Sequence, residues 1–256
     1  MKVFAAALEA HASGQAIALV TVIGAGGSTP RSGGARMLVS TEGLLAGTIG
    51  GGAFEHRMIA AAQDALRTGR PARVAADLRT DLGMCCGGRM EVYIEPLMPK
   101  PRLWIFGAGH VAQAVARLMP ELDFAVHVID ERPEWCTSDR FSRAELHAQD
   151  PLNFIEGHDG PPPTHVLITT HDHALDQALL EVFLQRELGW LGMIGSRAKV
   201  QRFFKRLQAA GTPPETFERV SSPVGLSIGA ETPEEIAIAI AAELIAERRK
   251  AKPSAT

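Results

Sequence analysis

The chain has 256 residues, of which 46% are hydrophobic and 21% charged, the composition of a folded protein of ordinary type. Its length exceeds the usual size of one domain, so we expect two domains, each with a core of its own. The net charge of −3 leaves no broad basic surface for nucleic acid, and no apolar stretch approaches the roughly 20 residues that span a bilayer.

The first hundred residues predict an α/β domain. An amphipathic helix is expected over residues 1–14, strands within 16–27 and 33–52, and a helix from about Phe54 to Thr68. A further strand is expected over Met90–Ile94. Three prolines within Glu95–Pro101 disfavour regular structure and predict an interdomain linker. We therefore divide the chain into domains over residues 1–98 and 99–256.

The second domain shows alternating strand and helix patterns, which favour a mainly parallel sheet. The last helix begins at a proline preceded by a threonine cap, with glutamate three residues after the threonine, a capping box. The expected strands are 103–106, 125–130, 144–147, 165–170 and 190–194, and the expected helices are 111–118, 175–188, 198–208 and 233–249.

The motif Gly107-Ala108-Gly109 follows the first of these strands and precedes a helix, the context in which a glycine pair binds a dinucleotide. Gly107 permits the tight turn, and Gly109 lets the backbone approach a pyrophosphate. The helix that opens at His110 directs its first amides at the anion. The sequence thus predicts a Rossmann-like nucleotide-binding domain with Gly107, Gly109 and His110 in the binding site.

Asp130 ends the next strand, 21 residues after Gly109, where an acidic side chain commonly accepts hydrogen bonds from ribose hydroxyls. This spacing indicates a ligand that resembles NAD more than NADP. A simple turn or cap at the strand end is the alternative. The nearby Arg132 leaves a phosphate contact open.

Two motifs of the first domain are candidate ligand contacts. The run Gly50, Gly51 and Gly52 precedes a helix and can present amides to an oxyanion, although a tight turn explains it equally well. Cys86 precedes paired glycines, and its thiolate can ligate a soft metal; a small thiol in the core is the alternative. The adjacent Cys85 does not fit zinc spacing, and an odd cysteine count indicates reduced thiols in the cytoplasm.

Two later loops also follow strands of the parallel sheet. His171 and His173 lie after one strand, where they can bind a metal, relay protons, contact phosphate or simply bond within the loop. Ser196 and Arg197 open a helix after another strand and suit an anionic ligand, with an ordinary serine N-cap as the alternative.

Taken together, these motifs resemble the XdhC/CoxI family, the xanthine dehydrogenase accessory proteins. The resemblance runs through the chain in order, from the Gly27–Arg31 segment to the final helix. Two positions depart from the family pattern: Cys85 adds a second cysteine, and Ser227 stands where an acidic residue is commoner. The resemblance rests on the motifs at residues 49–52 with Glu55, 86–88, 107–111, 170–173, 192–197 and 225–230.

The resemblance implies a maturation protein with a non-catalytic or weakly catalytic role. Such a protein binds molybdenum cofactor, supports its sulfuration by a cysteine desulfurase, and inserts it into xanthine dehydrogenase or a related molybdenum hydroxylase. The motif match implies a molybdenum contact for Cys86 and a cofactor contact for the Gly50–Gly52 loop. We also expect a homodimer.

Two other hypotheses remain open. Gly107, Gly109 and Asp130 are compatible with an NAD(P)-dependent oxidoreductase that uses His171 or His173 as its acid–base group. The pairing of tyrosine with a lysine four residues later, common in one dehydrogenase class, is absent, because Tyr93 is followed by leucine at that position. A scaffold that joins desulfurase and target enzyme is the third hypothesis, since a fold does not fix a function.

Overall fold

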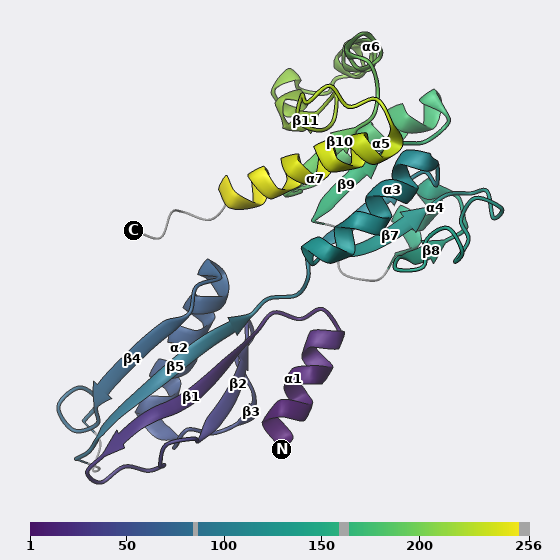
Figure 1. Cartoon of the computed structure of the whole chain (residues 1–256). Coiled ribbons are helices and arrows are strands. Elements are labelled where there is room, and N and C mark those ends of the chain that lie inside the picture. Colours follow the sequence, from purple (N-terminus) through teal and green to yellow (C-terminus); the bar gives the residue numbers. More distant parts are fainter. Residues whose placement is uncertain (84–86, 159–163, 251–256) are drawn as a thin grey trace. The chain divides into compact units, whose positions relative to one another are not determined.

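The computed structural model of the chain describes residues 1–83, 87–158 and 164–250 (Figure 1). It splits into two compact units, Met1–Pro99 and Lys100–Thr256, referred to below as unit 1 and unit 2. Within the described residues, no helix has both the length and the apolar character needed to cross a membrane.

Unit 1 is built on a five-stranded antiparallel sheet with the strand order β3-β2-β1-β5-β4. The long strands β1 and β5 lie at its centre. Its elements are α1 (Lys2–Ala12), β1 (Ile17–Gly26), β2 (Arg36–Ser40), β3 (Leu44–Gly47), α2 (Gly52–Thr68), β4 (Ala72–Asp77) and β5 (Arg89–Leu97).

The two helices of unit 1 cover opposite faces of this sheet, because successive side chains of a strand point to opposite faces. Ala18, Val20 and Val22 of β1 pack in one cluster with Phe54 and Met58 of α2. Ile17, from the same strand, packs in a second cluster with Ala10 of α1. The alternating strand pattern thus gives unit 1 two cores.

The predicted linker is partly wrong, because its first three residues, Glu95–Leu97, belong to β5. Pro96 pairs with Ala18 of β1 but lies beyond Ala72↔Ile94, the last pair between β4 and β5. A strand with one neighbour tolerates proline, because the donor that proline lacks is not needed on the open side. The strand β4 was not predicted.

Unit 2 contains a six-stranded sheet with the order β11-β10-β9-β6-β7-β8, in which all pairs are parallel. Its strands are β6 (Arg102–Phe106), β7 (Ala125–Ile129), β8 (Glu145–His147), β9 (His165–Ile168), β10 (Trp190–Met193) and β11 (Val220–Ser221). Its helices are α3 (His110–Leu118), α4 (Pro151–Gly157), α5 (His173–Leu184), α6 (Arg197–Ala209) and α7 (Pro233–Lys250), with short 3-10 helices at Met119–Leu122 and Pro214–Arg219.

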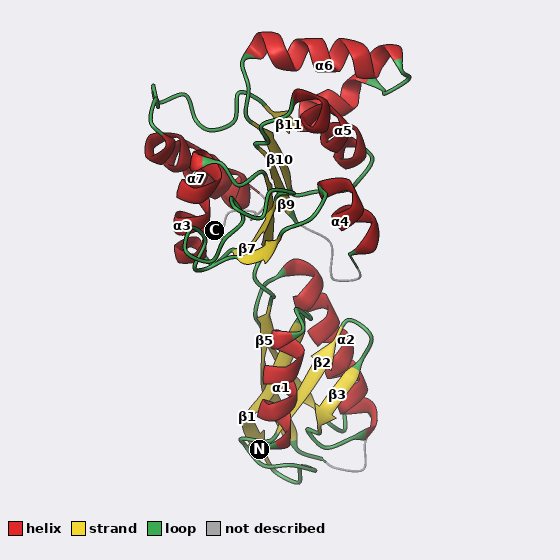
Figure 2. Ribbon diagram, turned by 90° about the vertical axis from the view of Figure 1, so that its right-hand side faces the viewer, coloured by secondary structure: helices red, strands yellow, loops and turns green. Residues whose placement is uncertain are grey.

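Helices cover both faces of the parallel sheet (Figure 2). Leu103 and Ile105 of β6 share a cluster with residues of α3 and α7, whereas Trp104 and Phe106 share one with residues of α4, α5 and α6. From the β8 edge, the strands follow the order of a doubly wound nucleotide-binding sheet. The predicted α/β class with a Rossmann-like second domain is confirmed.

Helix α4 was not predicted, although its start carries a clear signal. Asp150 accepts hydrogen bonds from the amides of Leu152 and Asn153, and Pro151 occupies the first position of the helix. An aspartate cap followed by proline favours a helix start. At seven residues, the helix is too short to show the apolar period on which the prediction depended.

Candidate functional site

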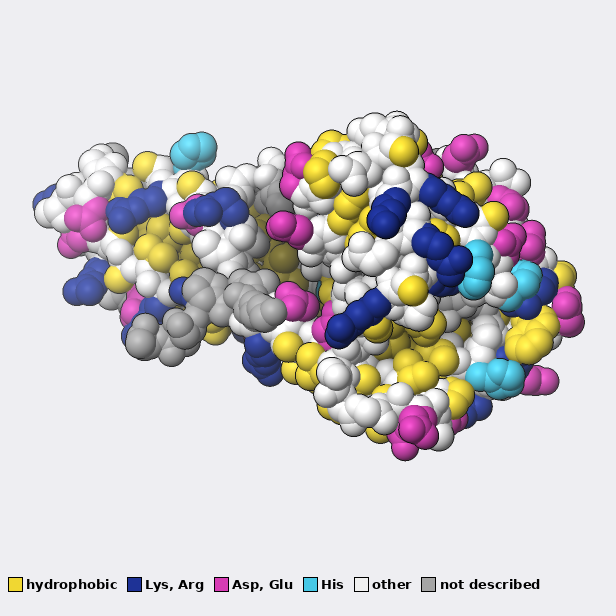
Figure 3. Space-filling view, turned by 90° about the horizontal axis from the view of Figure 1, so that it is seen from above, with side chains coloured by type: hydrophobic (Ala, Val, Ile, Leu, Met, Phe, Trp, Pro, Cys, Tyr) yellow, Lys and Arg dark blue, Asp and Glu magenta, His cyan; other side chains and the backbone are white. Residues whose placement is uncertain are grey.

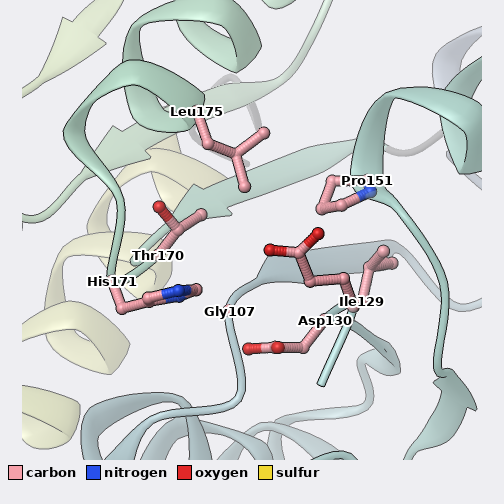
Figure 4. Close-up of a pocket in the computed structure, with 8 residues that line it drawn as sticks. Gly107, Ile129, Asp130, Pro151, Thr170, His171 and Leu175 are labelled. Carbon is pink, nitrogen blue, oxygen red and sulfur yellow. The ribbon is translucent and has the colours of Figure 1, made fainter. Parts of the chain in front are cut away.

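The sheet of unit 2 changes its winding direction at β6, which lies between β7 and β9. Open α/β sheets bind ligands at such a point, beyond the carboxyl ends of the strands. The predicted site residues Gly107, Asp130 and His171 come together there and line a shallow pocket with Thr170 and Leu175 (Figure 4). His171 and Asp130 face it from opposite sides of Gly107.

The two glycines of the turn have different roles. Gly107 has a φ of +104°, and a Cβ added there would lie 2.3 Å from the carbonyl oxygen of Thr169. Gly107 therefore lets the β9–α5 connection approach the turn. Gly109 has a φ of −69°, and no heavy atom lies within 4 Å of its added Cβ. The open side of the turn is thus at Gly109.

Helix α3 begins directly at this open side. Gly109 is its N-cap residue, and no side chain among the described residues caps the helix. The first amides of a helix need acceptors and carry partial positive charge. His110, the first helical residue, is exposed, and its ring lies edge-on to Trp135 with the ring centres 5.8 Å apart.

Asp130 is only 3% exposed, and both of its carboxylate oxygens already accept hydrogen bonds from the protein. Oδ2 accepts hydrogen bonds from the Ala108 amide at 2.7 Å and from Arg132 Nη2 at 2.7 Å. Oδ1 accepts hydrogen bonds from Arg132 Nε and from the backbone amide of Arg132. Burial alone raises the pKa of the Asp130 carboxyl, but the hydrogen bonds from Arg132 and Ala108 outweigh it and lower the pKa. A ribose would have to compete with these donors.

Two guanidinium groups lie beside the turn. Arg140 Nη2 donates to the carbonyl oxygen of Ala108 at 3.0 Å, and Arg132 is held by Asp130. Both groups contact Trp135, with distances to a ring centre of 4.5 Å from Arg140 and 5.1 Å from Arg132. The sequence prediction missed Trp135 and Arg140, which come from the irregular segment after β7.

A buried ion pair supports the loop after β9, and the sequence did not indicate it. Asp176 is 1% exposed and accepts hydrogen bonds from Thr170 Oγ1 at 2.7 Å and Lys199 Nζ at 2.5 Å. Thr170 in turn lines the pocket. Asp176 belongs to α5 and Lys199 to α6, and no local spacing connects two residues so far apart in the chain.

Ser196 and Arg197 lie at the start of α6, one strand further along the sheet. Ser196 caps α6 by accepting a hydrogen bond from the Lys199 amide at 3.3 Å. Arg197 is exposed and neither residue lines the pocket. Helix α6 has no acidic residue, and basic side chains gather at this end of unit 2 (Figure 3). His171 is exposed, and its neighbour Asp172 caps α5.

The triple-glycine loop of unit 1 binds a carboxylate of the same chain, that of Glu55. Glu55 Oε2 accepts hydrogen bonds from Thr48 Oγ1 at 2.5 Å and from the amides of Ile49 at 2.9 Å and Gly51 at 3.2 Å. Burial raises the pKa of the Glu55 carboxyl, but these hydrogen bonds outweigh it and lower the pKa. Of the amides that we expected to bind a ligand's oxyanion, that of Gly51 thus donates to this carboxylate, and that of Gly50 donates to Thr48 Oγ1.

We expect the Glu55 carboxylate to stabilise unit 1 in a pH-dependent way. Because its pKa is lower in the folded state, the stabilisation is present above the ordinary value of 4.5 and lost as the pH falls through the folded pKa. Glu55→Gln should lower the free energy of unfolding by about 1–2 kcal/mol at pH 7, and the difference from the wild type should shrink towards pH 4. Urea unfolding at several pH values measures this.

The exposed Glu42 provides the matched control. Glu42→Gln should change stability by less than about 0.5 kcal/mol at either pH, as is usual for surface substitutions. A loss in Glu55→Gln that stays constant from pH 7 to pH 4 would contradict the ionic role of Glu55.

The second motif of unit 1 lies against the same loop as the glycine run. An added Cβ on Gly50 would lie 2.6 Å from Pro30 Cγ, and one on Gly88 would lie 2.7 Å from Thr29 Cγ2. The loop that joins β1 and β2 therefore contacts both motifs. Gly51 has open space around its added Cβ, and Gly52 begins α2. Cys86 lies outside the described residues.

Comparison with known protein families shows which family this chain belongs to. Residues 103–244 match the XdhC Rossmann domain, and residues 10–77 match the XdhC and CoxI family. The chain belongs to the XdhC and CoxI family. The resemblance inferred from the motifs is confirmed, and the Rossmann match contains the whole turn from Gly107 to His110.

Individual relatives of this XdhC/CoxI chain extend the comparison. It is 36% identical over 251 residues to the uncharacterized protein YqeB of Escherichia coli K12, covering 96% of this chain and 46% of YqeB. It is 36% identical over 161 residues to a Bacillus subtilis protein named as a probable xanthine dehydrogenase subunit, covering 62% of this chain and 47% of that protein. The chain thus spans about half the length of these curated relatives.

A solved structure is similar to this family member along nearly its full length. It is the crystal structure of a protein from Bacillus halodurans named as a xanthine dehydrogenase, with a TM-score of 0.55 and 26% sequence identity. The match covers 98% of this chain and 97% of the other. Two of these three proteins therefore carry the name xanthine dehydrogenase.

Proposed function

We propose that this protein binds molybdenum cofactor, supports its sulfuration and inserts it into xanthine dehydrogenase or a related molybdenum hydroxylase. Unit 2 binds the phosphate of the cofactor at the Gly107–Gly109 turn. The observation that carries this proposal is the open side of the turn at Gly109, directly at the start of a helix that no described side chain caps. Membership of the XdhC and CoxI family supports the choice of ligand.

The chemistry of the turn suits a phosphate. Helix amides without acceptors bind an anion, and the helix dipole adds favourable potential. Arg140 donates to Ala108 inside the turn, and Arg132 lies next to it on Asp130, so two cations flank the proposed phosphate position. The rings of His110 and Trp135, which contact each other, extend this surface, and Arg140 lies over the Trp135 ring. The molybdenum, when bound, would supply the redox chemistry of the recipient enzyme.

The contacts of Asp130 favour this cargo over a nicotinamide dinucleotide. Recognition of a ribose requires free carboxylate oxygens, whereas each Asp130 oxygen accepts hydrogen bonds from Arg132. A ribose would displace an ion pair whose carboxylate is only 3% exposed. A cofactor held mainly by its phosphate does not have to break this pair.

Titration of the full chain with molybdenum cofactor and, separately, with NAD and NADH tests the proposal. We expect saturable binding of molybdenum cofactor and at least about tenfold weaker binding of either nicotinamide, a difference of about 1.4 kcal/mol. Calorimetry under anaerobic conditions measures all three ligands in the same buffer. Tight binding of NAD or NADH without binding of molybdenum cofactor would overturn the proposal in favour of an NAD(P)-dependent oxidoreductase.

The remaining parts of the proposal concern unit 1 and the partners. Cys86 is the proposed molybdenum contact, because a thiolate suits a soft metal, and the Gly50–Gly52 loop is a further proposed cofactor contact. In the same titration, Cys86→Ala should weaken binding, and Cys85→Ala is the matched control. A cysteine desulfurase and the recipient hydroxylase are the proposed partners of a cytoplasmic homodimer.

A further inference from the structure

Three potential metal ligands meet on the sheet of unit 2, and none of them belongs to the Gly107–Gly109 turn. They are His127 of β7 and Glu145 and His147 of β8, and their ligand atoms all lie within 4.8 Å of one another. His127 Nδ1 lies 3.2 Å from His147 Nε2. Glu145 places one carboxylate oxygen 3.5 Å from His127 Nδ1 and the other 3.6 Å from His147 Nε2.

The register of the two parallel strands produces this cluster. His127 is opposite Glu145, and Ile129 is opposite His147. Glu145 and His147 are two residues apart and therefore share a face of β8. His127 neighbours Trp104, which belongs to the core on the side of α4, so the cluster lies on this side of the sheet.

The spacing of the ligand atoms fits one small cation. Zinc binds histidine nitrogen at about 2.0–2.1 Å and carboxylate oxygen at about 2.0–2.2 Å in tetrahedral sites, which places neighbouring ligand atoms roughly 3.3–3.5 Å apart. The separation of 3.2 Å between His127 Nδ1 and His147 Nε2 matches this edge length, while Glu145 brings one oxygen to 3.5 Å from His127 and the other to 3.6 Å from His147. With one ligand atom from each residue, the three atoms lie within 4.8 Å of one another, so a rotation of the Glu145 carboxylate would bring all three around a single ion.

The surroundings of the cluster suit a bound ion. The His127 and His147 rings are stacked and largely buried. The indole N–H of Trp104, whose ring contacts the His127 and His158 rings, has no hydrogen-bond acceptor among the described residues. A water on the metal offers such an acceptor.

We propose that His127, His147 and Glu145 form a binding site for a divalent transition metal of the zinc type, with three protein ligands and a fourth position for water. Two histidines with one glutamate and an open position are a ligand set known for zinc. The site uses none of the residues in the molybdenum cofactor proposal, so each proposal stands or fails alone. The simpler alternative is a hydrogen bond between two neutral histidines, which binds no metal.

Cobalt(II) tests this site, because a tetrahedral cobalt centre absorbs visible light. We expect the metal-free full chain to bind one Co²⁺ with such a spectrum, and Zn²⁺ to displace it. Glu145→Gln and His147→Asn should each weaken binding by more than the roughly 10–100-fold that even outer-sphere changes cost. Glu145 is 64% exposed, so its replacement should leave the fold intact.

Controls separate this cluster from other ligands in the chain. His56→Asn, at an exposed position of α2, should bind Co²⁺ as the wild type does. Double replacement of Cys85 and Cys86 by alanine should also leave the spectrum unchanged, because the proposed site contains no sulfur. A wild-type chain without the visible spectrum, or a Glu145→Gln variant that binds with unchanged affinity, would overturn the proposal.

Discussion

Gly107→Ala is expected to lower the free energy of unfolding of unit 2 by about 3 kcal/mol or more, since backbone strain and overpacking each cost about 1–3 kcal/mol. The added Cβ would lie 2.3 Å from the Thr169 carbonyl oxygen and 2.9 Å from the Thr170 Cα. The φ of +104° is unfavourable for any side chain. Neither neighbour can move easily, because both are backbone atoms next to a central strand. Urea unfolding followed by circular dichroism measures the effect.

The other glycine of the same turn gives the matched control. Gly109→Ser adds a side chain where the structure has open space, at an ordinary φ, and serine is a good N-cap residue. We expect unchanged or slightly higher stability for this variant. Equal stability of Gly107→Ala and Gly109→Ser would contradict the close contact between the turn and the β9–α5 connection.

The second large effect concerns binding at Gly109. Aspartate and asparagine have the same shape and cap helices about equally well, so Gly109→Asp and Gly109→Asn should fold equally well. They differ in charge. At about 4 Å in water, each pair of unit charges interacts by about 1 kcal/mol, and a phosphate carries more than one charge. We therefore expect at least about tenfold weaker cofactor binding by Gly109→Asp than by Gly109→Asn.

Local patterns were sufficient to predict most of the fold. The alternation of strands and helices after Arg102 predicted the parallel sheet, and the glycine motif identified the strand that lies at its centre. Glu95–Leu97 and α4 were missed for physical reasons: an open strand edge accepts Pro96, and a seven-residue helix shows little periodicity. Tertiary context decided the first case, whereas α4 carries a local cap signal at Asp150 and Pro151.

The candidate site was harder to predict, because its residues meet through side-chain contacts between distant segments. Asp130 lines the pocket with Gly107, yet its hydrogen bonds to Arg132 change what it can bind. Glu55 accepts a hydrogen bond from the Gly51 amide of the glycine run, which the sequence left open as a ligand site. The cluster of His127 with β8 depends on strand register, which short apolar runs do not specify.

The dissociation constants of molybdenum cofactor for the wild type, Gly109→Asn and Gly109→Asp, measured by calorimetry in one buffer, test most directly whether the Gly107–Gly109 turn holds the phosphate. If it does, the constant should rise at least about tenfold from the asparagine to the aspartate variant, a penalty that screening makes smaller at high salt. Equal dissociation constants for the two variants, in chains that fold alike, would contradict phosphate binding at this turn.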